Sequence, residues 1–460
     1  MAKIVLIGAG SHSFARYLIS DLLSYPELRD STIVLMDIQK EALDLIAAFA
    51  RNLVKQYGFP TKIESTTNRR EALDGADYVV VTIQVGGRRQ AARDINDKYG
   101  IEDGSNGVFN GLRQIPVILD ICRDMEELCP DAWLLEYSNP VPTICWAVND
   151  YTRIKNVGLC HSVQATSYEL ARYIGIPYKD IEVPEGAYFP HFGHLPQEEF
   201  KDITYWVAGI NHMAWFLEFK WKGKDAYPLL RERFKDPAVY SGPDAHWDGP
   251  DVVRAEIFKT FGYFNTEASS IVAHMVPYFF KRNRPELFER YKLVTPQMRA
   301  EDIKQLDKTR KELDNGFGSQ LDRGIKFPIL RSTEYCATII HSIETGTPSR
   351  INGNVKNNGL ITNLSQGCCV EMPCLVDDKG IHPCLVGDLP PQLAALNQAN
   401  INSQGMAVKG TVEKDKTKIL QAVLLHPYTG AMLTIDETRQ MVDELFLAEK
   451  DYIKDFESAV

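Results

Sequence analysis

The sequence predicts an α/β protein: a Rossmann-like, doubly wound parallel sheet followed by a mixed α+β C-terminal domain. The opening stretch KIVLIGAGSHSFARYLISDLLS joins a short β-branched strand, a Gly-x-Gly turn and an amphipathic helix. Further short apolar strands alternate with helical stretches up to about residue 162. After about residue 195 the pattern changes to mixed strands and then to long helices. We therefore place one domain at residues 1–180 and a second at residues 181–460.

Five strands are expected in the first domain, because short apolar runs are separated there by stretches with helical patterns. The runs are KIVLI, STIVLMD, ADYVVVTIQ, AWLLEYSNP and IKNVGLCHS. Between the third and the fourth run, QIPVILDICRDMEELCP has the pattern of a helix. Strands that are joined by helical crossovers pair in parallel, so a parallel sheet is the expected result.

The second domain is expected to begin with strands and to end with helices. TYWVAGINHMAWFLEFKWKG has the pattern of mixed strands, whereas PQMRAEDIKQLDKTRKELDN and TIDETRQMVDELFLAEKDYIKDF have helical patterns. The segment 181–200, rich in proline and aromatic residues, is expected to be a long loop or an insertion. No repeat, low-complexity tract or polar linker separates the two domains, so we expect a broad interface between them.

The composition indicates an ordinary globular enzyme of 460 residues, 44% hydrophobic and 24% charged. The net charge of −10 and the pI near 5.6 argue against nucleic acid or an anionic membrane as a partner. The start MAKIVLIGAGSHSF lacks the features of a signal peptide, and no window is long and apolar enough to span a bilayer, so we expect a cytoplasmic protein. The nine cysteines lack the spacing of a disulfide framework and are expected to be thiols.

The turn after the first strand has the pattern of a dinucleotide site. Gly8, Gly10 and Ser13 give G-x-G-x-x-S between a strand and a helix, where backbone N–H groups and the helix N-terminus bind a pyrophosphate. Asp37 closes the second strand, where a carboxylate accepts hydrogen bonds from the ribose hydroxyls of NAD and repels the 2′-phosphate of NADP. The alternative is a tight turn without a cofactor. We expect NAD to be bound by Gly8, Gly10, Ser11, Asp37 and Gln84.

Cys160 in GLCHSVQ and His212 in AGINHMAWF raise the question of a metal site. A thiolate and an imidazole from separate strand ends can share one divalent metal and leave positions open for a chelating substrate. The alternatives are a buried thiol for Cys160 and a core histidine for His212. The location favours a site, because Asn139 and Cys160 end successive strands at the carboxyl edge, where α/β sheets bind their ligands.

Several motifs, in their order along the chain, resemble those of family 4 glycoside hydrolases. They are IGAGS, YSNPV, CHSVQ, AGINHMAW, RAEIFKTFGYFNTE, GNVKNNGLITNLSQGCCVE and LAALNQANINSQ. The resemblance spans nearly the whole chain, and Cys-His-Ser-Val is most similar to the motif of the melibiase-type α-galactosidases. It implies a glycosidase that depends on NAD and manganese and cleaves α-galactosides.

The resemblance implies a redox route in place of catalysis by two carboxylates. In this route NAD⁺ takes a hydride from sugar C3, and the metal polarises the resulting ketone as a Lewis acid. The proton on C2 becomes acidic, and the aglycone leaves C1 by elimination. Water then adds, and the hydride returns to C3, so the cofactor is regenerated in every cycle.

The resemblance also implies roles for individual residues. Cys160 and His212 match the metal ligands, and Asn139 matches a residue beside the substrate and the metal. His161 is expected to contact the substrate or to assist the leaving group, with a structural role as the alternative. Two further residues are expected to bind the substrate, Arg113 and Asn211.

Three departures from the family pattern lie on the substrate side. EDGSNGVFNGLRQ replaces a glycine-rich loop near Arg113, ASSIVAHM replaces an acidic-His pair after GYFNTE, and the segment 181–200 is expected to be inserted. The base that removes the C2 proton stays open among Tyr263, Glu267 and a metal-bound hydroxide. The sugar stays open as well: an α-glucoside, a glucuronide or galacturonide, and a β- or thio-glycoside are the alternatives to an α-galactoside.

An NAD-dependent dehydrogenase of the lactate/malate type is the second enzyme hypothesis, because it shares the opening strand–helix–strand unit. That type needs no metal pair of cysteine and histidine. A module that binds NAD without turnover is the third hypothesis. We expect a small glycoside as the partner, no nucleic acid, no membrane, and a homodimer or homotetramer.

Overall fold

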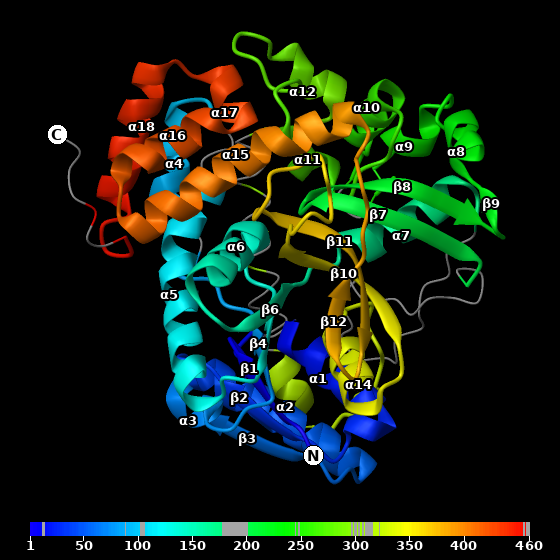
Figure 1. Cartoon of the computed structure of the whole chain (residues 1–460), viewed down its shortest axis with the longest axis vertical. Coiled ribbons are helices and arrows are strands. Elements are labelled where there is room, and N and C mark those ends of the chain that lie inside the picture. The colour runs from blue at the N-terminus through cyan, green and yellow to red at the C-terminus, as the bar shows by residue number, and fades with distance from the viewer. Residues whose placement is uncertain are drawn as a thin grey trace.

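A computed structural model describes most of the chain (Figure 1). The described residues are 1–11, 14–87, 89–101, 106–176, 201–243, 249–295, 316–321 and 323–453, with the single residues 245, 246, 298, 301, 304, 305, 308 and 456. The expected loop 181–200 and Ser13 of the turn lie outside the described residues. Most of the expected helix 296–315 does so too.

Six parallel strands form the N-terminal part of the sheet and confirm the predicted fold class. Their order is β3-β2-β1-β4-β5-β6, and every neighbouring pair is parallel. The five expected strands are present, and a sixth, β3, stands at the edge. The strands are β1 (Lys3–Ile7), β2 (Thr32–Met36), β3 (Lys62–Thr66), β4 (Tyr78–Val81), β5 (Trp133–Glu136) and β6 (Lys155–Gly158).

Helices cover both faces of this parallel sheet, as a doubly wound fold requires. On β1, Ile4 and Leu6 belong to the core that includes residues of α1 and α2. Val5 and Ile7 point to the opposite face, into the core that includes residues of α5 and α6. The helices of this part are α1 (Phe14–Ser24), α2 (Lys40–Tyr57), α3 (Arg69–Leu73), α4 (Gln90–Lys98), α5 (Asn106–Leu128), α6 (Val141–Tyr151) and α7 (Ser162–Tyr173), with a 3₁₀ turn η1 (Pro26–Leu28).

The C-terminal strands continue the same sheet with antiparallel pairing. After β6 the order is β10-β11-β7-β8-β9, and β12 pairs with β11, which gives one sheet of twelve strands. The link between the two parts is the pairing of β10 with β6, at Asn354 and Gly158. The strands are β7 (Ile203–Ile210), β8 (Met213–Trp221), β9 (Lys224–Asp225), β10 (Ser349–Lys356), β11 (Cys369–Asp377) and β12 (Gly380–Pro383).

The remaining helices surround this antiparallel part and the end of the chain. Helix α15 crosses the upper part of the molecule and packs against α5, α6 and α16, so it bridges the two halves of the chain (Figure 1). Among the helices that the structure describes, none is long and apolar enough to cross a membrane. The helices are α8 (Tyr227–Arg233), α9 (Ala238–Ser241), α10 (Val252–Phe261), α11 (Ser269–Met275), α12 (Glu286–Tyr291), α14 (Cys336–Thr345), α15 (Pro391–Glu413), α16 (Lys416–Leu425), α17 (Pro427–Met432) and α18 (Ile435–Ala448).

Candidate active site

The glycine turn after β1 is closed by the carboxylate at the end of β2. Gly8 has φ +89°, and a Cβ there would lie 2.7 Å from the backbone oxygen of Thr82, so only glycine fits. The backbone N–H of Gly10 donates to Asp37 Oδ2 at 2.8 Å, and Gln39 donates to Asp37 Oδ1 at 2.8 Å. Because a carboxylate accepts about four hydrogen bonds, Asp37 keeps capacity for two ribose hydroxyls. The turn and the carboxylate therefore fit NAD.

Two other predicted cofactor residues lie beside this turn. Ser11 Oγ accepts the backbone N–H of Phe14 at 3.4 Å, and the Ser11 backbone oxygen accepts that of Ala15, so Ser11 caps the start of α1. Gln84 is exposed and follows β4, the strand next to β1. Both stand at the carboxyl ends of neighbouring parallel strands, where this fold binds dinucleotides.

Cys160 lies at the junction of β6 and α7. The backbone N–H of Leu159 donates to the Glu136 oxygen of β5 at 2.8 Å, which continues the ladder to the residue before Cys160. Cys160 is buried, and α7 begins two residues later. Burial raises the pKa of its thiol to about 11, and the neighbouring His161 opposes this effect. A metal ion would bind the thiolate and release its proton.

His212 lies in the tight turn between β7 and β8. Asn397 of α15 holds this turn: its Nδ2 donates to the Met213 oxygen at 2.8 Å, and its Oδ1 accepts the indole N–H of Trp215 at 3.2 Å. The Asn211–His212 peptide bond is cis, as is Asn139–Pro140. The hairpin and α15 together hold His212 just after the carboxyl end of β7, as Cys160 lies just after the carboxyl end of β6.

Glu267 is brought to His212 by a segment that pairs along β8. Thr266 donates its backbone N–H to the Ala214 oxygen at 2.8 Å, and Ala214 donates to Thr266 Oγ1 at 3.1 Å. Glu267 has φ +74°, a left-handed conformation that non-glycine residues adopt at a cost of about 1–3 kcal/mol. Such a conformation persists where the surroundings impose it, here directly after the paired segment.

Cys160, His212 and Glu267 form the group of metal-binding side chains that the described residues contain. One donor atom of each, a sulfur, an imidazole nitrogen and a carboxylate oxygen, lies within 4.8 Å of the other two. Ligand atoms on one ion with bonds of about 2.0–2.3 Å lie at most roughly 4.6 Å apart, so the three side chains are close enough to reach one divalent ion after a small adjustment. The set also leaves coordination positions for a substrate.

His161 forms a partly buried ion pair beside this group. Its Nδ1 lies 3.4 Å from Oε1 of Glu334, whose side chain is buried. Burial alone would lower the pKa of His161, but the bond to Glu334 and the charges of Cys160 and Glu267 raise it to about 10. The ion pair with Glu334 therefore favours the charged form of this imidazole.

Glu334 is itself fixed to α1 through Ser332. The Ser332 Oγ accepts the backbone N–H of Glu334 at 3.1 Å, and both its hydroxyl and its backbone N–H donate to Asp21. Burial raises the pKa of Asp21 to about 7, against the bonds from Ser332. The position of Glu334 thus depends on a loop and a helix far apart in the sequence.

The other predicted residues have these surroundings. Asn139 is exposed at the end of β5, and Tyr263 packs edge to face on Tyr227, four residues before Glu267. Arg113 is engaged inside the protein: its Nη1 lies 2.7 Å from Glu449 Oε2. Its Nε also donates to a backbone oxygen at 3.3 Å. Substrate binding by Asn139, Arg113 and Asn211 stays a prediction.

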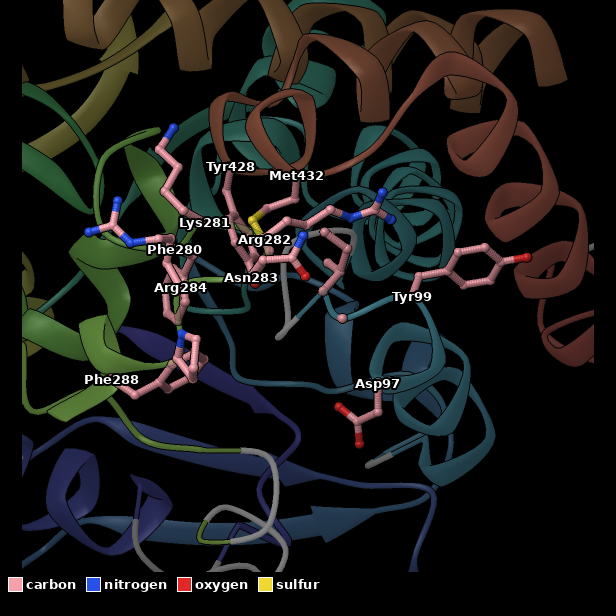
Figure 2. Close-up of a pocket in the computed structure, with 13 residues that line it drawn as sticks. Asp97, Tyr99, Phe280, Lys281, Arg282, Asn283, Arg284, Phe288, Tyr428 and Met432 are labelled. Atoms are coloured by element: carbon pink, nitrogen blue, oxygen red, sulfur yellow. The ribbon is translucent and has the colours of Figure 1, made fainter.

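A pocket of about 370 Å³ lies between the end of α4, the segment before α12, and α17 (Figure 2). Figure 2 shows Lys281 and Arg284 pointing away from its centre. The lining combines apolar side chains, among them Phe280, Phe288 and Met432, with polar ones, among them Asp97, Arg282 and Asn283. None of the residues predicted to form the site is among the described residues that line it.

Comparison with known proteins identifies the class. Residues 3–176 match the model "Family 4 glycosyl hydrolase" and residues 207–429 match "Family 4 glycosyl hydrolase C-terminal domain". The chain therefore belongs to glycosyl hydrolase family 4, and it is a glycosidase.

Within this family the chain is similar to two curated α-galactosidases. That of Bacillus subtilis strain 168 is 37% identical over 99% of this chain and 100% of its own length. That of Rhizobium meliloti strain 1021 is 32% identical over 100% of this chain and 90% of its own length. A 6-phospho-α-glucosidase from gut microorganisms, solved in complex with NAD and Mn²⁺, shares the fold with a TM-score of 0.78 at 19% identity, covering 99% of both chains.

Three site-adjacent residues were not predicted from the sequence: Glu334, Glu371 and Asn354. Glu371 is fully buried, and burial raises its pKa to about 7 against the opposing charge of His212. A usable signal was the carboxylate inside the apolar run CCVEMPCLV of β11. Glu334 has no comparable signal, because it lies outside any strand or helix.

Proposed function

We propose that this family 4 glycosidase is an α-galactosidase that depends on NAD and a divalent metal, with Mn²⁺ as the proposed ion. The observation that carries the proposal is the group of Cys160, His212 and Glu267 at the edge of a sheet whose first turn fits NAD. The similarity to the α-galactosidases of Bacillus subtilis and Rhizobium meliloti, over nearly their full lengths, supports an α-galactoside as the substrate.

The two halves of the chain divide the proposed work. Residues 1–180 hold the dinucleotide through the glycine turn and Asp37, and they contribute Cys160. Residues 181–460 contribute His212 and Glu267. When bound, NAD accepts and returns a hydride at sugar C3 and the metal acts as a Lewis acid on the oxygens of C2 and C3.

The protein's own residues then bind the sugar and move protons. Cys160 and His212 would hold the metal, and Asn139, which is exposed at the end of β5, would orient the sugar hydroxyls. Glu267 supplies a third ligand or takes the proton from C2, with Tyr263 as the other candidate base.

His161 forms an ion pair with Glu334, which favours the charged form of its imidazole, and it directly follows Cys160 in the chain. In the proposed mechanism it donates a hydrogen bond to the leaving oxygen, which stabilises the charge that develops as the aglycone departs. It therefore assists elimination.

The dehydrogenase hypothesis loses ground, because both family models that match are those of glycosyl hydrolases. The sugar is tested with a panel of nitrophenyl α- and β-glycosides, glucuronides, galacturonides and 6-phosphoglycosides, with NAD, Mn²⁺ and a reductant present. Preference for any sugar other than an α-galactoside refutes the proposed substrate.

The mechanism is tested in D₂O. If oxidation at C3 precedes cleavage, the C2 proton exchanges with solvent, so the released sugar carries deuterium at C2. Proton NMR or mass spectrometry of the product detects it, and a product without deuterium at C2 refutes the redox route. Location in the cytoplasm and assembly as a homodimer or homotetramer stay predictions.

A further inference from the structure

A row of four residues crosses the sheet between the strand that leads to Cys160 and the strand that leads to His212. Gly158 of β6 pairs with Asn354 of β10, Asn354 with Glu371 of β11, and Glu371 with Gly209 of β7. The two ends of the row adjoin the two predicted ligands. Cys160 follows Gly158 by two residues, and His212 follows Gly209 by three.

Only the two central residues of the row carry side chains. A Cβ at Gly158 would lie 2.9 Å from the Asn354 Cβ, and one at Gly209 would lie 2.9 Å from the Cα of Ala214. Neither end has room for a side chain. The side chains that the row places between the two ligand-bearing strands are therefore those of Asn354 and Glu371.

Each central side chain is bonded to one of those strands. Asn354 Nδ2 donates to the Gly158 oxygen at 3.3 Å. Asn211 Nδ2, in the residue next to His212, donates to Glu371 Oε2 at 3.4 Å. One side chain thus reaches toward Cys160 and the other toward His212.

The buried polar atoms of this row lower the stability of the fold. Asn354 and Glu371 are fully buried, and Asn354 Oδ1, Glu371 Oε1 and Asn211 Oδ1 have no hydrogen-bond partner among the described residues. Each such oxygen destabilises the fold, because a buried acceptor loses its hydrogen bonds to water without replacing them. Apolar side chains would hold the strands together at lower cost, so packing alone does not explain these polar residues.

Glu371 also stands outside the metal-binding group itself. That group contains Cys160, His212 and Glu267, and the Glu371 carboxylate is not part of it. A role as a direct ligand is therefore not what the geometry supports.

We propose that Glu371 and Asn354 are positioning residues that hold the strands of Cys160 and His212 at the separation a single metal ion requires. This inference rests on the proposed function, because it assumes that these two residues bind the metal. Residues that orient ligands from outside the coordination sphere change metal affinity by about 10–100-fold.

The test is a calorimetric titration of the full-length protein, with NAD bound, by Mn²⁺ alone. Glu371→Ala and Asn354→Ala should each bind Mn²⁺ about 10–100-fold more weakly than the unchanged chain. Glu371→Gln should restore the affinity, because its carbonyl accepts the Asn211 N–H and its amide donates to one of the unpaired oxygens.

Asn352→Ala is the matched control. Asn352 is buried on the same strand, and its Nδ2 donates to the Val207 oxygen of β7 at 3.0 Å, two residues away from the row. This variant should lose stability in urea to an extent similar to Asn354→Ala, yet bind Mn²⁺ like the unchanged chain. It separates loss of a buried bond from loss of ligand position.

The outcomes distinguish the inference from the proposed function. If the unchanged chain binds no Mn²⁺, the proposed metal site fails and the inference fails with it. If it binds Mn²⁺ and a folded Glu371→Ala binds equally well, only the inference is overturned. If Glu371→Gln loses as much as Glu371→Ala, the carboxylate acts by its charge and the positioning role is refuted. If Glu371→Ala does not fold, the Mn²⁺ affinities of Asn354→Ala and Asn352→Ala are compared instead. Equal affinities overturn the inference.

Discussion

Replacing Gly158 by alanine tests how tightly the sheet is packed behind the site. The added Cβ would lie 2.4 Å from Val141 Cγ1, 2.6 Å from Cys145 Sγ and 2.9 Å from the Asn354 Cβ. All three distances are shorter than those between non-bonded carbon or sulfur atoms, whose optimum is about 3.5–4.0 Å. Because β6 is paired on both sides, with β5 and with β10, its backbone has little room to retreat.

The expected loss follows from these contacts. Overpacking of a core by one methyl group costs about 1–3 kcal/mol of unfolding free energy. The value should be near the upper end, because Val141 is β-branched and buried, and Cys145 is fully buried as well. Displacement of β6 should also shift Cys160 and weaken Mn²⁺ binding.

The assay is urea unfolding followed by tryptophan fluorescence, in a double-mutant cycle with Val141→Ala. Truncation of Val141 removes the closest clashing atom, so the double variant should lose less than the sum of the two single variants, by about 0.5–3 kcal/mol. Gly111→Ala in α5 is the control: the nearest atom to its Cβ lies 3.6 Å away, and alanine should stabilise the helix by about 0.5–1 kcal/mol. If Gly158→Ala is as stable as the unchanged chain, or if the two single losses simply add, the steric reasoning is wrong.

Three further predictions concern the site and its support. Cys160→Ser and His212→Ala should each abolish glycosidase activity and Mn²⁺ binding while circular dichroism stays unchanged; turnover per folded molecule that survives either change contradicts the metal assignment. Asp37→Ser should weaken NAD and improve NADP in fluorescence titrations, because the charge that repels the 2′-phosphate is gone; an unchanged ratio of the two affinities argues against this role. Asp251→Asn leaves the fully buried Arg254 without its counter-ion and should lower the free energy of unfolding in urea by about 3–5 kcal/mol. Burial raises the pKa of Asp251, but Arg254 more than offsets this and holds it below 3.8. The stabilisation is therefore present above that pH and lost as the pH falls through it, so the gap between protein and variant should shrink in acid, and a constant gap speaks against the ion pair.

Most of the parallel strands were predictable because they are short apolar runs that are buried on both faces, whereas β6 (KNVG) is buried only in its second half. The exception is β3, whose residues KIEST are mostly polar and only partly buried. It stands at the edge of the sheet, where pairing on one side does not require an apolar sequence. Periodicity therefore finds central strands and misses this one.

The site was predictable where its residues end strands, and less so elsewhere. Cys160 and His212 follow recognisable apolar runs, so their position at one edge could be expected from the fold. Glu267 is placed by the pairing of its neighbour Thr266 with Ala214, a contact between residues about fifty positions apart. Asn354 and Glu371 depend on the pairing of β10 with β6, which joins residues 196 positions apart. Local patterns carry no information about such pairings.

The single sheet determines how this chain can be divided into fragments. Strand β10 arrives late in the chain, yet it is the seam between the strand of Cys160 and the hairpin of His212. Cleavage of the chain between residues 177 and 200 would place β6 and β10 on different fragments. Each fragment would then expose an edge strand with unpaired backbone groups, which pair readily with other strands. The two fragments should aggregate or reassociate, and neither should bind the metal alone. Chimaeras between relatives should fold only when β6 and β10, the two strands that join the parts of the sheet, come from the same protein.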